Sequence, residues 1–185
     1  PSPKRKAKQD LESMFELDDK LHILIMNVEA FSTQKGIKFA EKFLLAHDAF
    51  MVIDESTTVK NRKAMRTKNL VELGKYAKYK RILTGSPVTK SPMDLYSQCQ
   101  FLDPQALGQS SYFTFQNRYA IIQRKTFGGR SFNDIVGYRR LDELNAKLVS
   151  FSARTLKKDC LDLPDKIYVR RNVELTAQQA KVYEE

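Results

Sequence analysis

Short apolar runs alternate with amphipathic segments over the first half of the chain. Nearly continuous apolar runs occupy residues 21–26 and 49–53, and a shorter one occupies residues 81–83. Runs of this kind are typical of parallel strands that are covered on both faces. Between them, residues 35–46 and 62–77 carry apolar side chains at helical spacing. The alternation of strand and helix predicts an α/β fold, with a parallel sheet and flanking helices.

A further helix is predicted after the third strand, and the pattern then changes. The Ser-Pro pair at 91–92 supplies an N-cap and a first-turn proline for a helix that ends near Phe101. Residues 110–125 are aromatic and basic, a glycine pair follows at 128–129, and helical spacing returns over 141–151. We interpret this region as a mainly helical appendage, in which the glycine pair is compatible with a hairpin.

The composition describes a globular protein and excludes several kinds of site. Hydrophobic residues make up 42% of the chain and charged residues 29%, and no apolar run is long enough to cross a membrane. The two cysteines, Cys99 and Cys160, and the two histidines, His22 and His47, match no metal-ligand spacing and no disulfide framework. We therefore expect an intracellular protein that is not secreted: cytoplasmic if bacterial or viral, nuclear if eukaryotic.

Positive charge is concentrated in one stretch of the chain. The formal net charge is +10, and residues 60–90 alone contribute ten basic side chains against a single acid, Glu72, which gives a local charge of +9. Such a stretch attracts a polyanion through counterion release. A solvated helix face is the alternative interpretation, and the pattern alone does not separate the two. The ten basic residues are Lys60, Arg62, Lys63, Arg66, Lys68, Lys75, Lys78, Lys80, Arg81 and Lys90.

Polar clusters follow two of the predicted strands. Asp54 and Glu55 end the second strand, and Thr84, Gly85 and Ser86 end the third. In parallel sheets, ligands bind at the carboxyl ends of strands, where these residues fall, and we expect a hydroxyl of the second cluster to lie beside the acidic pair and to be able to hydrogen-bond to it. Nucleotide hydrolases use such a carboxylate pair to hold magnesium and to accept a proton from the attacking water. Taken singly, each cluster also has a simpler explanation, a helix N-cap for the acidic pair and a Gly-Ser-Pro turn for the other.

The two clusters and their surroundings resemble motifs II and III of the Swi/Snf-type ATPases in helicase superfamily two. The first resembles the Asp-Glu-Ala-His sequence followed by Lys-Asn, and the second resembles the Leu-Thr-Gly-Ser-Pro turn. Four other segments are similar to family motifs and occur in family order: motif Ib, the helix after motif III, the linker with its Leu-Pro end, and the entry to the second lobe. In this chain the six segments are 54–61, 83–88, 25–29, 94–104, 154–164 and 173–183.

The resemblance implies an organisation and a set of roles. Residues 1–104 would be a partial first RecA-like lobe, 105–152 a helical protrusion, and 153–185 the linker and start of the second lobe, with Thr176 capping its first helix. The resemblance implies ATP and magnesium, and double-stranded DNA bound without sequence specificity. Asp54 would position the metal and Glu55 would be the general base, while Thr84, Gly85 and Ser86 would couple hydrolysis to DNA. Candidate DNA contacts are Asn27, Lys60, Arg62, Lys63 and Arg66.

The sequence departs from the family pattern at three places. Thr57 occupies the position of a usual His or Gln, and Thr155 replaces the second linker arginine. The phosphate-binding Gly-x-x-x-x-Gly-Lys-[Ser/Thr] motif occurs nowhere in the 185 residues. We therefore expect a fragment of a motor that does not hydrolyse ATP by itself.

Two further interpretations compete with the motor. The chain could instead be a non-catalytic DNA-binding or regulatory module derived from a helicase lobe. A helicase subunit of a restriction or defence system shares motifs II and III, but it does not share the linker pattern of residues 154–183. For the aromatic residues of 112–119, a place in the core of the appendage is favoured over a stacking platform for bases.

Overall fold

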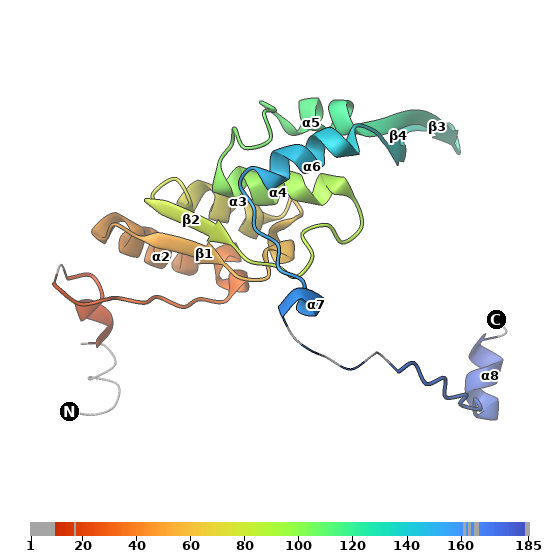
Figure 1. The fold of residues 1–185 in the computed structure, drawn as a ribbon, viewed down its shortest axis with the longest axis horizontal. Coiled ribbons are helices and arrows are strands. Elements are labelled where there is room, and N and C mark those ends of the chain that lie inside the picture. The colour runs from red at the N-terminus through yellow and green to blue at the C-terminus, as the bar shows by residue number, and fades with distance from the viewer. Residues whose placement is uncertain (1–9, 17, 161, 163, 165–166, 184–185) are drawn as a thin grey trace. The chain divides into compact units, whose positions relative to one another are not determined.

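A computed structural model describes residues 10–16, 18–160, 162, 164 and 167–183 of the chain (Figure 1). The chain divides into two units, Pro1–Phe151 and Ser152–Glu185. The basic residues at positions 4–6 lie outside the described part of the chain, as do Leu161 and Leu163 of the predicted linker.

A parallel pair of strands lies at the centre of the first unit. Strand β1 (Phe50–Ile53) pairs with β2 (Tyr79–Ile82) in a register that places Ile53 opposite Ile82. The connection between them contains the short 3-10 helix η2 (Ser56–Val59) and helix α3 (Met65–Leu73). A strand, a helix and a parallel strand form the unit that the alternating pattern predicts, so the α/β prediction is confirmed.

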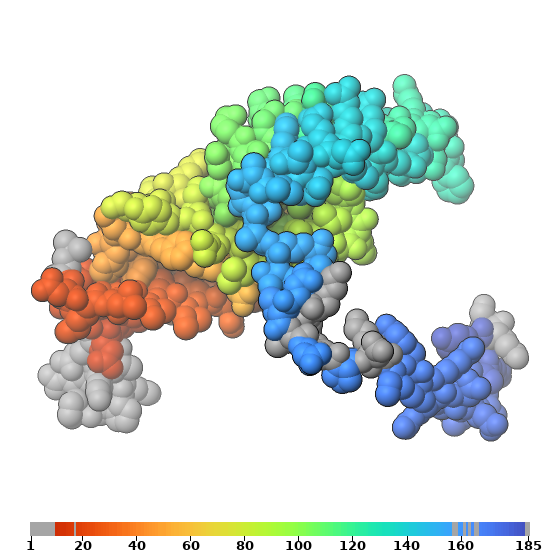
Figure 2. Space-filling model, in the orientation of Figure 1, coloured from red at the N-terminus to blue at the C-terminus, as the bar shows by residue number. Residues whose placement is uncertain are grey.

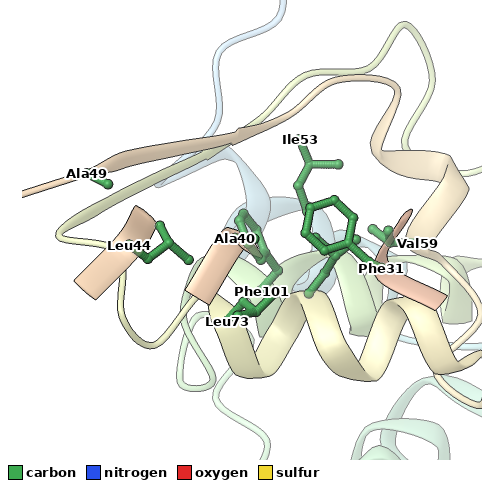
Figure 3. Close-up of a cluster of buried hydrophobic side chains, with 9 residues drawn as sticks. Phe31, Ala40, Leu44, Ala49, Ile53, Val59, Leu73 and Phe101 are labelled. Atoms are coloured by element: carbon green, nitrogen blue, oxygen red, sulfur yellow. The ribbon is translucent and has the colours of Figure 1, made fainter. Parts of the chain in front are cut away.

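Helix α2 (Gln34–Ala46) and α3 cover one face of this pair. Thr33 caps α2 by accepting a hydrogen bond from the Gly36 amide at 3.1 Å. Gly36 also permits close packing, because a Cβ at this position would lie 2.2 Å from the Ala30 carbonyl oxygen of the preceding 3-10 helix η1 (Val28–Ser32). Figure 3 shows the core that results, with side chains from η1, α2, β1, α3 and a later helix, α4 (Leu95–Leu102). Its labelled members are Phe31, Ala40, Leu44, Ala49, Ile53, Val59, Leu73 and Phe101.

The prediction of a buried strand over 21–26 is wrong. The segment is extended, but within the described residues it pairs with no strand. Its side chains alternate in exposure, and those of Leu21, Ile23 and Ile25 are 85%, 67% and 88% exposed. An extended chain becomes part of a sheet only when its backbone groups find a neighbour, and this segment contacts the rest of the unit on one side only.

The loop after β2 leads into a well-capped helix. Helix η3 (Pro92–Asp94) and α4 (Leu95–Leu102) follow one another, and Ser91 and Asp94 form a capping box at the start of η3. This confirms the predicted start at the Ser-Pro pair. Helix α4 buries Phe101 against the sheet side of the unit and Cys99 against the protrusion. Burial raises the pKa of the Cys99 thiol to about 12, so this cysteine stays protonated and is inert.

The protrusion consists of two helices and a β-hairpin. Helix α5 (Tyr112–Tyr119) runs into strand β3 (Ala120–Phe127), which turns at the glycine pair into β4 (Arg130–Tyr138) and is followed by α6 (Leu141–Val149). The hairpin and the helix after it are confirmed. Phe115 and Tyr119 are fully buried, which confirms their interpretation as core residues, whereas Phe113 is 65% exposed and the prediction is wrong for it.

In its described residues the second unit contains two short helices, α7 (Lys157–Cys160) and α8 (Ala177–Tyr183). Thr176 precedes α8, and its hydroxyl accepts a hydrogen bond from the Gln179 amide at 3.4 Å, as predicted for a cap. Across the described residues of both units, no helix combines the length and the apolar character that crossing a membrane requires.

Candidate nucleotide site at the strand ends

The two polar clusters lie side by side because their strands are neighbours in the sheet. The pairing continues beyond the strands: the Leu83 amide donates to the Ile53 carbonyl at 2.9 Å, and the Ser56 amide donates to the Leu83 carbonyl at 3.0 Å. Asp54 and Glu55 therefore occupy the chain between two hydrogen bonds to the segment that leads directly into Thr84. This is the edge of a parallel sheet at which ligands bind.

The acidic pair is exposed and has an unusual backbone. Glu55 adopts the left-handed conformation (φ 46°, ψ 57°), which costs a non-glycine residue on the order of 1–3 kcal/mol and persists only where the surroundings enforce it. The Asp54 carboxylate accepts a hydrogen bond from the Glu55 amide at 2.9 Å. Within the described residues neither carboxylate forms an ion pair, so their remaining lone pairs are available to a ligand.

The donor set suits magnesium bound through a nucleotide. Magnesium prefers oxygen ligands in an octahedral arrangement and is commonly held by one or two carboxylates, with phosphate oxygens and water completing the shell. Two adjacent carboxylates provide this minimum. The described residues contain no cluster of three or more potential metal ligands. Asp54 and Glu55 therefore fit a metal that arrives with its phosphates and do not form a metal cage of their own.

The hydroxyls of the second cluster bond within their own loop. We expected Thr84 or Ser86 to be able to hydrogen-bond to the acidic pair. Instead, the Thr84 hydroxyl accepts from the Ser86 amide at 3.2 Å and the Ser86 hydroxyl donates to the Val88 carbonyl at 2.9 Å. Short Ser and Thr side chains compete for nearby backbone groups in this way. The loop is thus ordered by itself, and its connection to the acidic pair lies elsewhere.

That connection is Gln98 of α4, which the sequence reasoning missed. Its side-chain oxygen accepts the Ser56 hydroxyl at 2.7 Å, and its side-chain nitrogen donates to the Pro87 carbonyl at 2.8 Å and to the Asp94 carbonyl at 2.8 Å. Gln98 and Ser56 are both 0% exposed. A buried amide with three hydrogen bonds holds its partners in one arrangement. The only available signal was a polar residue among the apolar positions of a predicted helix.

The start of α4 fixes the surrounding loops as well. The Ser97 hydroxyl donates to the Lys60 carbonyl at 3.1 Å. The Asp94 carboxylate accepts from the Thr89 hydroxyl at 2.9 Å and from the Lys90 amide at 3.1 Å. Burial alone raises the pKa of the Asp94 carboxyl, but these hydrogen bonds outweigh burial and lower that pKa. The segments after both strands are therefore anchored to one helix.

The predicted DNA-binding cations have different surroundings. The Lys60 ammonium donates to the Thr89 hydroxyl. The Arg62 guanidinium lies 4.1 Å from the ring centre of Tyr112, and the Arg66 side chain donates to the Thr58 carbonyl at 3.2 Å. Lys63 is exposed, and its ammonium has no partner in the described part of the chain. Of these four side chains, only that of Lys63 has no interaction partner among the described residues. The contact of Arg62 with Tyr112 joins the basic segment to the protrusion.

Asn27, the remaining predicted DNA contact, lies beside the basic segment. It is exposed and precedes η1, which packs against α3. Two contacts fasten these elements: Arg66 lies 3.9 Å from the Glu29 carboxylate, and the Asn69 side chain donates to the Phe31 carbonyl at 2.7 Å. The fold therefore brings Asn27 to the side of the unit that carries Arg66.

A large apolar hollow adjoins the acidic pair. Its volume is about 840 Å³, and it lies between the extended segment 21–26, α2 and β1, with Asp54 among its lining residues. Most of its lining side chains are apolar. Such a surface does not attract a triphosphate, since burial of unpaired charge is costly.

The sequence of the whole chain decides the family. A family profile for the SNF2-related domain matches residues 4–185. The chain belongs to the SNF2-related domain family. This confirms the resemblance to the Swi/Snf-type ATPases, which was first visible in the motifs around the two strand ends.

Relatives of this SNF2-related chain include proteins that are named for their work on DNA. It is 34% identical over 132 residues to the DNA annealing helicase and endonuclease ZRANB3 of Bos taurus, covering 71% of this chain and 12% of the relative. It is 29% identical over 137 residues to the human TATA-binding protein-associated factor 172, and this match covers 74% of this chain and 7% of the relative. A chromodomain-helicase-DNA-binding protein 3 homolog of Caenorhabditis elegans is 28% identical over 165 residues, and this match covers 89% of this chain and 8% of the relative. The chain thus spans a small part of each relative, and no solved structure gives a significant match.

Proposed function

We propose that this chain is part of a DNA-dependent ATPase motor that moves along duplex DNA, with its hydrolytic residues at the ends of β1 and β2. The observation that carries the proposal is the parallel register of these strands, which places an acidic pair and the Thr84–Ser86 turn at one sheet edge. Membership of the SNF2-related family and relatives named as helicases support it.

In the proposed mechanism each acidic residue has one task. Asp54 holds the metal that accompanies ATP, and that ion, when bound, neutralises charge on the phosphates. Glu55 accepts the proton of the attacking water as the water oxygen bonds to the terminal phosphorus, while the bond from that phosphorus to the bridging oxygen breaks and ADP leaves. The left-handed backbone of Glu55 sets the direction in which its side chain leaves the chain. The hydrogen bond from the Ser56 amide to the Leu83 carbonyl holds the turn that follows.

We further propose that Gln98 is the positioning residue that makes the two turns act together. Its amide contacts Ser56 in the acidic turn and Pro87 in the loop of Thr84, Gly85 and Ser86. Any displacement of the loop that follows DNA contact must move the Pro87 carbonyl, and the buried amide passes that displacement to Ser56. This route takes the place of the direct hydroxyl contact that the sequence suggested.

DNA contact is assigned to the side that carries η1 and the start of α3. Lys63 would contact DNA phosphates, and so would the side chains that are near it in sequence or packing: Lys60, Arg62, Arg66 and Asn27. Phosphate contacts carry no sequence information, so binding is proposed to be sequence-nonspecific. A motor that acts on DNA works inside the cell, in cytoplasm or nucleus, and this agrees with the cysteine usage.

The experiment that tests the proposal is hydrolysis by a longer form of the protein that includes a phosphate-binding loop and a second lobe. Glu55→Gln should abolish DNA-stimulated phosphate release, a loss of roughly a hundred-fold or more, because general-base catalysis contributes about that much. Nucleotide and DNA affinity should change little, since the amide preserves size and hydrogen-bonding capacity. Turnover that survives in this variant excludes Glu55 as the base.

The 185 residues alone are proposed to lack hydrolytic activity, because the sequence contains no phosphate-loop motif and the hollow beside Asp54 is apolar. A steady-state assay with saturating DNA is expected to give no turnover. The same two observations favour a second function, a DNA-binding or regulatory module. A longer protein that binds DNA but also fails to hydrolyse ATP would support the module and contradict the motor.

A further inference from the structure

The β3–β4 hairpin extends beyond the core that anchors it. Its base is fixed by Ile122 and Ile135, which pack against the protrusion core, and by Tyr138, whose hydroxyl donates to the Ser91 hydroxyl at 2.8 Å. All residues from 123 to 133 are exposed. Figure 2 shows this part of the chain, in teal, projecting from the rest of the first unit. The six residues from Ile122 to Phe127 span about 17 Å at the usual rise of a strand.

The turn at the tip is built to be tight. Gly128 and Gly129 both have positive φ, 56° and 76°, as a two-residue turn between antiparallel strands of this twist requires. A Cβ at either position would meet no atom within 4 Å. The glycines are therefore required by backbone conformation and not by packing, and they keep the tip narrow.

One face of the tip combines aromatic and cationic side chains. The register pairs Lys125 with Phe132 and Phe127 with Arg130, and directly paired residues share a face. Phe127 and Phe132 are 83% and 50% exposed. The opposite face carries Arg124 with Asn133 and the hydrogen-bonded pair Thr126–Ser131. We name the first set, Lys125, Phe127, Arg130 and Phe132, the hairpin face.

Charge on the hairpin identifies the class of partner. Residues 120–140 hold five basic side chains against one acid, Asp134, which gives a net charge of +4. Asp134 accepts from the Lys125 ammonium at 2.6 Å, and this leaves Arg130 as the cation of the hairpin face with no partner among the described residues. A protein-binding surface of this size would place charge at its rim and keep its centre free of it. Exposed rings interleaved with cations instead match a nucleic-acid strand, in which π-faces alternate with phosphates.

We propose that the hairpin face binds unpaired nucleotides adjoining the duplex on which the motor acts. This rests on the proposed function, and it specifies the substrate as DNA with a single-stranded segment. In a fully paired duplex the base faces are stacked on one another, so Phe127 and Phe132 could reach them only by prising a step apart. Unpaired bases offer their faces freely, while Arg130 neutralises a neighbouring phosphate.

The test compares two labelled DNA probes by fluorescence anisotropy of the 185-residue chain. One is a blunt duplex, and the other is the same duplex with a single-stranded oligothymidine tail. The wild-type chain should bind the tailed probe more tightly. Phe127→Leu with Phe132→Leu keeps apolar side chains that suit a strand but removes the rings. This double variant should lose about ten-fold or more in affinity for the tailed probe, the usual effect of removing base stacking, and remain within about two-fold of wild type on the blunt duplex.

The opposite face of the same strands provides the control. Thr126→Ala with Ser131→Ala alters neighbouring exposed positions and should leave both affinities unchanged. Arg130→Gln should reduce the salt dependence of binding to the tailed probe only. Equal wild-type affinity for the two probes overturns the proposal, as does an equal loss on both probes in the leucine variant. If the chain binds the blunt duplex and the tail adds no affinity, only the proposal for the hairpin face is refuted. If the chain binds neither probe, the proposed DNA contact is refuted as well.

Discussion

The strand half of the first unit (residues 21–104) and its protrusion leave apolar side chains exposed at different places. In the strand half, one face of the sheet is packed by α2 and α3, while Phe50, Val52 and Leu83 are 55%, 44% and 47% exposed. In the protrusion, Phe115 and Tyr119 of α5 have no exposed surface, and Phe127 and Phe132 of the hairpin are 83% and 50% exposed. The strand half is thus incompletely covered beside the candidate site, whereas the protrusion combines a closed core with an exposed hairpin.

The difference follows from the two kinds of strand pairing. The protrusion uses an antiparallel hairpin with helices next to it in sequence, so its core closes through local contacts. A parallel pair needs cover on both faces, which distant segments must provide. Within the described residues, Phe50 and Val52 of β1 remain exposed, and the extended segment 21–26 lines the hollow beside β1 and α2. The candidate site therefore lies in the half whose paired strands are distant in the sequence, whereas the hairpin strands of the protrusion follow one another directly.

The largest expected effect is removal of a ring from the protrusion core. Phe115→Ala should lower the free energy of unfolding by about 3–5 kcal/mol, because it deletes a fully buried ring and leaves a cavity. Urea unfolding followed by circular dichroism measures this, with the exposed Phe113→Ala as the matched control. A cost below about 1 kcal/mol would mean that the core of the protrusion is loosely packed and not closed.

The next effect concerns the residue that joins the two halves of the site. Gln98→Met keeps the side-chain volume but leaves the Ser56 hydroxyl and the Pro87 carbonyl without partners. Each unpaired buried group costs about 1–3 kcal/mol, and the same urea experiment should show the sum. Ser56→Ala removes one partner and should cost less. If Gln98→Met is neutral, the amide does not hold the loops.

An acid-dependent effect is expected at Glu143 of α6. Hydrogen bonds from Arg118 and from the Tyr119 hydroxyl lower its pKa from 4.5 to about 2. A lowered pKa stabilises the fold above pH 4.5, and this contribution is lost as the pH falls toward 2. Glu143→Gln should therefore lower the Tm at pH 7. The difference in Tm between this variant and the wild type should shrink as the pH falls from 4.5 to 2. Asp134→Asn, which alters an exposed pair on the hairpin, is the control and should shift the Tm less. A difference that is independent of pH would contradict the account of Glu143.

The smallest effect is expected on the uncovered side of the strand half. Ile25→Gln changes a side chain that is 88% exposed, so the free energy of unfolding should change by at most about 0.5 kcal/mol. The half-buried neighbour Leu24→Gln should cost more. If the exposed position proved as sensitive as the half-buried one, segment 21–26 would be covered in solution and the contrast between the two halves would weaken.

Periodicity predicted most of the elements because local spacing decides them. The apolar positions of α2 and the Ser-Pro start of η3 were sufficient for two elements, and the glycine pair marked the hairpin. The strand at 21–26 was mispredicted because its apolar run is real but pairing requires a neighbour that no local pattern reveals. Helix α3 is shorter than the predicted 62–77, since Arg62 and Lys63 lie in a turn and Gly74 follows its last residue.

The candidate site was predictable where it depends on strand ends and not where it depends on tertiary contacts. Asp54 and Thr84 could be placed together because parallel neighbours end at one edge. Gln98 could not be identified, since it lies 42 residues from Ser56 and its role exists only through buried hydrogen bonds. Similarly, the cations of residues 60–66 looked alike in the sequence, whereas packing commits Arg62 to an aromatic ring and leaves Lys63 free within the described chain.

The DNA-stimulated rate of ATP hydrolysis of the longer protein carrying Gln98→Met shows whether Gln98 joins the two strand ends. If the amide makes the two strand ends one hydrolytic unit, that rate should fall by roughly a hundred-fold, the usual consequence of a misplaced catalytic group, while nucleotide affinity is retained. Gln98→Glu can still accept from Ser56 but cannot donate to Pro87, and it should lose DNA stimulation first. A wild-type rate in Gln98→Met would show that the strand ends work without this bridge.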